Sequence, residues 1–148
     1  IAYKGRVEHH DSSGGGGVIG EGDVQWMTAA SGVLHKEFHE QAWSKEGGYF
    51  QMVQLWVNLP AKFKMSVPKY QAISNNLMNK LALENDLGIV EVIAGNYKDV
   101  QGSASTFSPI HVYNAKLKRA VALMKSLDFL LRLLDWNDCK QDSSYYLF

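Results

Sequence analysis

The sequence predicts a mainly β fold that ends in an α-helix. Short candidate strands alternate with glycine-rich turns through roughly the first 60 residues. In residues 49–59, apolar side chains alternate with polar ones, which is the period of a strand with one buried face. Residues 115–136 instead repeat their apolar side chains every three to four positions, and this period is typical of an amphipathic helix.

Composition limits the classes of function. A chain of 148 residues with 46% hydrophobic side chains suits one domain with a single core. Its 15 basic and 15 acidic residues cancel, so no general charge favours nucleic acid or an anionic membrane. The single cysteine, Cys139, excludes an internal disulfide and a cysteine-only zinc cluster. Without a signal-peptide pattern or a long apolar run, we expect a soluble cytoplasmic protein.

The first half of the chain contains the clearest strand signals. Turns are expected at residues 12–17 and 20–23, which are rich in serine, glycine and aspartate. Strands are predicted over residues 24–28 and 32–38, followed by the alternating stretch 49–59. Pro60 ends that stretch, because proline cannot donate a hydrogen bond to a strand ladder. The large side chains of Trp26 and Trp56 are expected in the core.

The second half has fewer signals before its final helix. Residues 61–87 are expected to be irregular, with a short helix over residues 75–83. Two more strands are predicted at residues 89–94 and 110–117. These boundaries divide the chain into a β domain, residues 1–117, and a helix with its tail, residues 118–148, that packs on the same domain or on a dimer partner.

His35 and Glu37 are the candidate metal ligands. Residues two apart on a strand point to the same face, so both side chains project together while Lys36 faces away. Imidazole and carboxylate suit iron, nickel, manganese or zinc. Two ligands alone bind weakly, since a catalytic centre usually has three protein ligands and an open position. The alternative is a polar pair without a metal.

Three other histidines are candidates to complete the site. His39 follows on the same strand face, but four residues along a strand span about 13 Å, so convergence requires a bend after Glu37. His9 and His10 are adjacent, so at most one of them points inward. The sequence leaves open whether any of the three joins His35.

Four motifs together resemble the pirin family of cupin-type proteins. They are GRVEHHDS at residues 5–12, GDVQWMTA at 22–29, GVLHKE at 32–37 and QLWVNLP at 54–60, and the similarity extends to about Leu117. The resemblance implies a cupin-like β-sandwich or partial barrel. One departure is Ala30, where the family usually has glycine.

The resemblance also implies a metal site. Pirins hold one transition metal with a His-x-His pair and a later His-x-Glu pair, and the second pair matches His35 and Glu37. The first pair would precede Ile1, so we expect a truncated domain whose metal binding is weak or absent. The histidine that matches His9 is not a metal ligand in the family. Some pirins act as flavonol dioxygenases, and others bind transcription factors or enzymes.

Two functions follow as alternatives. The first is a non-catalytic binding domain with a lost or weakened metal site and no catalytic residue. The second is a quercetinase-like dioxygenase with a rebuilt metal site. A barrel that lacks strands exposes backbone edges, and pairing between two chains covers them, so we expect a homodimer. A protein partner fits the first alternative, whereas neither nucleic acid nor membrane is expected as a partner.

Overall fold

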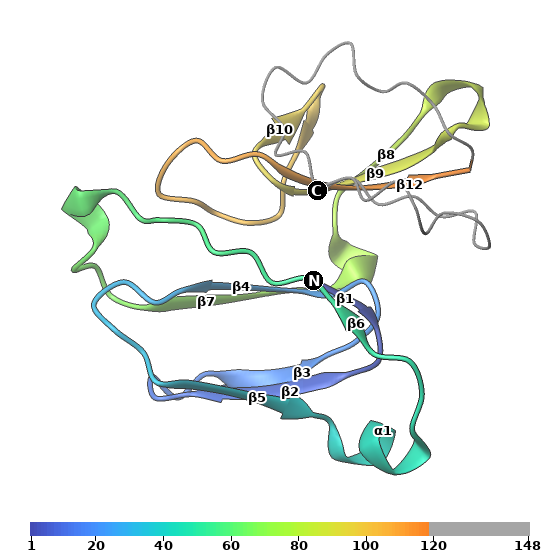
Figure 1. The fold of residues 1–148 in the computed structure, drawn as a ribbon. Helices are drawn as coiled ribbons and strands as arrows, with labels where there is room; N and C mark the ends of the chain where they lie inside the picture. The colour runs from blue at the N-terminus through green and yellow to red at the C-terminus, as the bar shows by residue number, and fades with distance from the viewer. Residues whose placement is uncertain (119–148) are drawn as a thin grey trace, which may run out of the picture. The chain divides into compact units, whose positions relative to one another are not determined.

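The computed structural model describes residues 1–118 and places them in two compact units (Figure 1). The first unit runs over Ile1–Leu77, and the second begins at Met78. The predicted C-terminal helix lies outside the described residues, apart from its first few positions, which form the end of a strand.

The first unit is built around a three-stranded antiparallel sheet. Its order is β3 (Gly16–Ile19), β2 (Val7–Asp11) and β5 (His35–His39). The turn between β2 and β3 is tightened by Asp11, whose Oδ1 accepts hydrogen bonds from the backbone N–H groups of Ser13 and Gly15 at 2.8 and 2.9 Å. The Ser13 hydroxyl donates to the same oxygen at 2.6 Å, and this bond, followed by the backbone bonds, holds the pKa of the Asp11 carboxyl below its usual range.

A second layer in this unit comes from two short ribbons. The first pairs β4 (Val24–Thr28) with β7 (Lys69–Ile73), and the second pairs β1 (Ala2–Lys4) with β6 (Gln51–Met52). Figure 1 shows the β4–β7 ribbon facing the three-stranded sheet, which gives the unit its sandwich form. A small core fills part of the unit with buried apolar side chains, namely Ala2, Val7 and Ile19, with Met52 packed against them.

The helix of the first unit is short and is fixed by its cap. It is α1 (Gln41–Glu46), and the Glu40 carboxylate accepts bonds from the N–H groups of Ala42 and Trp43, both at 2.9 Å. Three 3-10 turns complete the described helical elements: η1 (Ala61–Phe63), η2 (Asn75–Leu77) and η3 (Glu84–Asp86).

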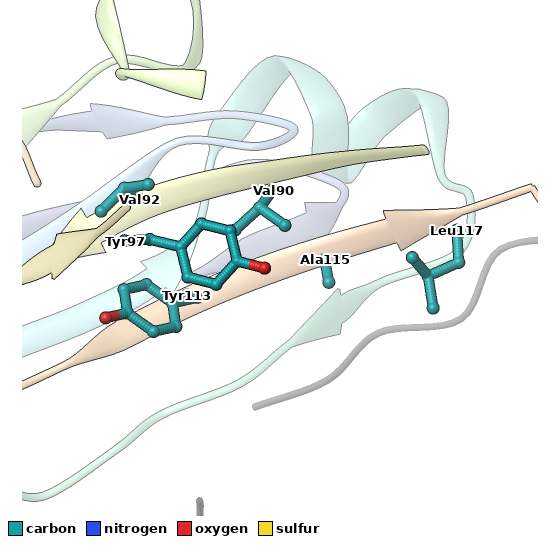
Figure 2. Close-up of a cluster of buried hydrophobic side chains, with 6 residues drawn as sticks. All are labelled: Val90, Val92, Tyr97, Tyr113, Ala115 and Leu117. Carbon is teal, nitrogen blue, oxygen red and sulfur yellow. The ribbon is translucent and has the colours of Figure 1, made fainter. Parts of the chain in front are cut away.

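The second unit contains its own antiparallel sheet. The order is β12 (Val112–Leu117), β9 (Gly88–Ala94) and β8 (Lys80–Ala82), with a hairpin of β10 (Asn96–Tyr97) and β11 (Val100–Gln101). Alternate residues of β9 and β12, together with Tyr97 of β10, form the hydrophobic core shown in Figure 2, made of Val90, Val92, Tyr97, Tyr113, Ala115 and Leu117. The residues between them face the other side and are largely polar.

Several predicted elements are confirmed. The strand over residues 24–28 is β4, the strand over 89–94 is contained in β9, and β12 occupies most of residues 110–117. The strand predicted over residues 32–38 is present but displaced, because β5 begins at His35. The fold class, mainly β with a sandwich, is therefore confirmed.

The prediction of a long strand over residues 49–59 is wrong beyond Met52. Only Gln51 and Met52 are in a strand, where they pair with β1. A strand requires a neighbour that exchanges backbone hydrogen bonds, and side-chain alternation does not supply one. The Trp56 side chain is 91% exposed, so its assignment to the core is also wrong for the described residues.

The helix predicted over residues 75–83 is also wrong. That segment contains the short turn η2 and the strand β8, whose residues pair with β9. The prediction missed β7 and α1 as well. Among the described residues, the structure shows no helix with the length and hydrophobicity needed to cross a membrane.

Candidate functional site

His35 and Glu37 project from the same face of β5, as the sequence predicts. The His35 Nε2 atom lies 3.2 Å from the Glu37 Oε1 atom. The two side chains are 17% and 25% exposed, so they are sheltered but still reachable by a small ion. Pairing of β5 with β2 fixes this face, because Glu37 lies opposite His9 and His35 lies opposite Asp11.

The separation of the two atoms fits two ligands of one metal ion. Metal–nitrogen and metal–oxygen bonds of about 2.0–2.2 Å at octahedral or tetrahedral angles place neighbouring donor atoms about 2.9–3.5 Å apart. The same distance also fits an ion pair or a hydrogen bond. The part of the chain from residue 1 to residue 118 shows no group of three or more His, Cys, Asp or Glu side chains arranged to hold a metal.

His9 is buried beside this pair. Its side chain on β2 is 0% exposed, and its Nε2 atom shares a hydrogen bond of 2.8 Å with the hydroxyl of Tyr70 on β7. The His9 ring centroid lies 4.8 Å from that of Tyr70 and 5.9 Å from that of His35. Burial, and secondarily the nearby His35, lower the pKa of His9, and burial raises the pKa of Tyr70.

Gln25 on β4 approaches the site from the second layer of the sandwich. Its Nε2 atom lies 3.2 Å from His35 Nε2. Among the described residues, the buried side-chain polar atoms without a hydrogen-bond partner are all in this cluster: His9 Nδ1, Gln25 Oε1 and His35 Nδ1. Unpaired buried polar atoms are costly and uncommon, so their concentration here marks a functional site rather than a structural core.

The other two candidate histidines lie away from the pair. His10 points to the outer face, where its Nε2 atom contacts Glu8 Oε1 at 3.1 Å. His39 packs against the rings of Trp43 and Phe50, with centroid distances of 5.1 and 4.6 Å. The bend that would bring His39 to His35 and Glu37 is not present in β5, so the structure does not join it to the pair.

Sequence reasoning identified the pair but missed Gln25 and Tyr70. Both side chains reach the site across the sandwich, and their distances in sequence to their partners are 10 and 61 residues. A local pattern does not reveal a contact of that kind. The available signal was that QWMT at residues 25–28 belongs to the motif set, and that a polar residue there alternates with Trp26.

The chain is similar to several known proteins. The model of the pirin family matches residues 1–57. A Pseudomonas aeruginosa protein named as a candidate quercetin 2,3-dioxygenase is 52% identical over 118 residues, which cover 80% of this chain and 41% of that protein. A pirin-like protein of Caulobacter vibrioides is 42% identical over 62% of this chain and 32% of its own length. The chain thus spans about two fifths or less of these relatives.

Solved structures give the same result. A crystal structure of quercetin 2,3-dioxygenase from Acinetobacter baumannii matches with a TM-score of 0.76 and 55% identity, covering 80% of this chain and 41% of that one. A protein from Geobacillus kaustophilus matches with a TM-score of 0.70 and 32% identity, covering 82% and 46% of the two chains. Together with the shared motifs, these similarities show that the chain belongs to the pirin family of cupin-fold proteins.

Proposed function

We propose that this chain supplies His35 and Glu37 as two ligands of a transition-metal centre that serves a dioxygenase reaction on a flavonol-type substrate. The observation that carries the proposal is the 3.2 Å separation of His35 Nε2 and Glu37 Oε1 on one sheltered strand face. The similarity to proteins named for quercetin 2,3-dioxygenase supports the substrate class. Iron, nickel, manganese and zinc all accept this ligand type.

A metal at this pair would act as a Lewis acid toward a hydroxyl oxygen of the substrate. The chain's own residues would hold the ion and shelter it. His35 presents Nε2 and Glu37 presents Oε1, while the buried His9 and the partly buried Tyr70 are hydrogen-bonded to each other beside them. Since two protein ligands alone bind an ion weakly, further ligands are needed for a stable centre.

The decisive experiment measures metal content and affinity in the untagged chain and in three variants. His35→Ala and Glu37→Gln are expected to lose the metal, because each removes one of the two donors. His39→Ala is the matched control, since it removes a histidine from the same strand that packs away from the pair. Equal affinity in all four proteins would refute the proposed site. Oxygen consumption with a flavonol then tests the activity.

A second candidate function is a non-catalytic interaction domain that pairs with a second copy of itself. It is favoured by large apolar side chains exposed in residues 1–77, which otherwise face water. They include Leu34, Tyr49, Trp56, Met65 and Val67, each more than 80% exposed. Light scattering after size-exclusion at micromolar concentration tests the homodimer, and a monomer with folded strands would contradict it.

A further inference from the structure

Gln25 contacts the same nitrogen of His35 that faces Glu37. The Gln25 Nε2–His35 Nε2 distance and the His35 Nε2–Glu37 Oε1 distance are both 3.2 Å. Three side chains from two layers of the sandwich therefore meet at one point. β4 holds Gln25 there through its ladder with β7, in which Gln25 lies opposite Ala72.

With the Gln25 amide oriented as it is in the structure, hydrogen bonding alone does not satisfy all three groups, whereas with the amide turned over a protonated His35 Nε2 donates to the oxygens of both Gln25 and Glu37. If His35 Nε2 carries a hydrogen, it donates to Glu37, and the amide N–H group of Gln25 then faces another donor. If Nε2 carries a lone pair, it accepts from Gln25, and the Glu37 carboxylate then faces that lone pair. A cation at this point would bind the lone pair and the carboxylate, and the amide oxygen of Gln25 would face it once the amide is turned over.

The amide of Gln25 could contact such a centre in two ways, through its oxygen or through its nitrogen. Its Oε1 atom is buried and has no hydrogen-bond partner. A half-turn about the last side-chain torsion exchanges the oxygen and the nitrogen with almost no change in shape. The oxygen then faces the ion as a hard donor, whereas the original orientation offers an N–H to an oxygen bound on the ion.

We propose that Gln25 is the third group of the His35–Glu37 centre and contacts either the bound ion or an oxygen ligand held on it. This inference rests on the proposed function, since it requires an ion at the pair. It assigns Gln25 a role that differs from that of Tyr70, whose hydroxyl is hydrogen-bonded to His9. Gln25 would thus govern how strongly the centre holds its non-protein oxygen ligand.

The first test is a gain of binding in Gln25→Glu. This substitution replaces the neutral amide with a carboxylate of nearly the same shape, so the chain then offers one imidazole and two carboxylates at one point. The affinity for Co²⁺, measured by calorimetry, is expected to rise about tenfold or more. Gln51→Glu is the matched control, because it makes the same charge change at an exposed position of β6 in the same unit.

The second test is Gln25→Leu, which keeps a similar volume without polar atoms. We expect acetohydroxamate, an oxygen-donor probe, to bind the Co²⁺-loaded variant about threefold to tenfold more weakly than the Co²⁺-loaded unchanged chain. The visible absorption of Co²⁺ reports this binding without any enzymatic turnover. Circular dichroism of each variant verifies that it folds.

The outcomes distinguish the claim that His35 and Glu37 bind a metal from the claim that Gln25 is the third group of the centre. If His35→Ala abolishes Co²⁺ binding while Gln25→Glu matches Gln51→Glu and Gln25→Leu leaves the probe affinity unchanged, the role of Gln25 is refuted and the pair stands. If Co²⁺ binds neither the unchanged chain nor Gln25→Glu, both claims fail. Tighter binding in Gln25→Glu that disappears when His35→Ala is added supports both.

Discussion

The two units differ in whether a buried polar side chain finds protein partners for its polar atoms. In the second unit, the Glu91 side chain is 1% exposed, and it is surrounded by Asn114 Nδ2 at 2.6 Å, Lys116 Nζ at 2.8 Å and Lys80 Nζ at 3.3 Å. In the first unit, His9 is equally buried, yet its Nδ1 atom has no partner. A polar group whose partners all come from the fold stabilises that fold, whereas one with an unused atom is available to a ligand.

The largest effect that tests this comparison is expected at Glu91. Glu91→Ala leaves Asn114 and the two lysines without their shared carboxylate, so the stability of the second unit should fall by about 2–4 kcal/mol. Urea unfolding, monitored by hydrogen exchange of the β9 backbone amides, measures this loss of stability. Glu84→Ala, an exposed carboxylate in η3, is the control. A loss of stability in Glu91→Ala smaller than that in Glu84→Ala would show that the Glu91 cluster does not stabilise the second unit.

A smaller loss is expected from Tyr70→Phe in the first unit. The variant keeps the ring and leaves His9 Nε2 without its 2.8 Å hydrogen bond, which should cost about 1–3 kcal/mol. Denaturant unfolding gives the value. Tyr49→Phe is the matched control, because the Tyr49 side chain is 86% exposed. Equal stability of the two variants would mean that the Tyr70–His9 bond contributes nothing to the unit.

Acid should weaken the first unit through His9. Burial lowers the pKa of His9 in the folded chain, so the unfolded chain binds more protons as the pH falls below about 6.5. The contribution of His9 to stability is therefore fully present above that pH. It is lost as the pH falls below that value, until the folded histidine is also protonated. Unfolding midpoints between pH 8 and pH 5 measure the slope. His9→Gln should flatten it, and His10→Gln, on the outer face, should not.

The smallest predicted effect concerns Ala30, the position where the family usually has glycine. Ala30 has a φ of 44°, in the left-handed region that glycine adopts without strain. Ala30→Gly relieves that strain but adds freedom to the unfolded chain, so the expected net gain is only about 0.5 kcal/mol. Thermal unfolding detects such a change. A loss of stability would show that the turn tolerates alanine without strain.

The sequence predicted those parts of the fold and site that depend on local spacing. The same-face placement of His35 and Glu37 follows from the period of a strand, and β4 and β9 follow from short runs of β-branched and apolar residues. The contacts of Tyr70 and Gln25 were not predicted, because they arise only when two sheets face each other. The error at residues 53–59 has the same origin, since a strand requires a partner that its own residues do not specify.

The register of β2 carries a consequence for folding accuracy. His9 and His10 are adjacent, so a slip of one residue against β5 would replace one inward imidazole with another and would leave the cluster superficially intact. The same slip, however, would move Glu8 into the place of Val7, which is 2% exposed in the core. Glu8 thus opposes this slip, because the slip would bury its carboxylate without a partner, and a Glu8→Val chain would lose that penalty while keeping the one from the Asp11 turn.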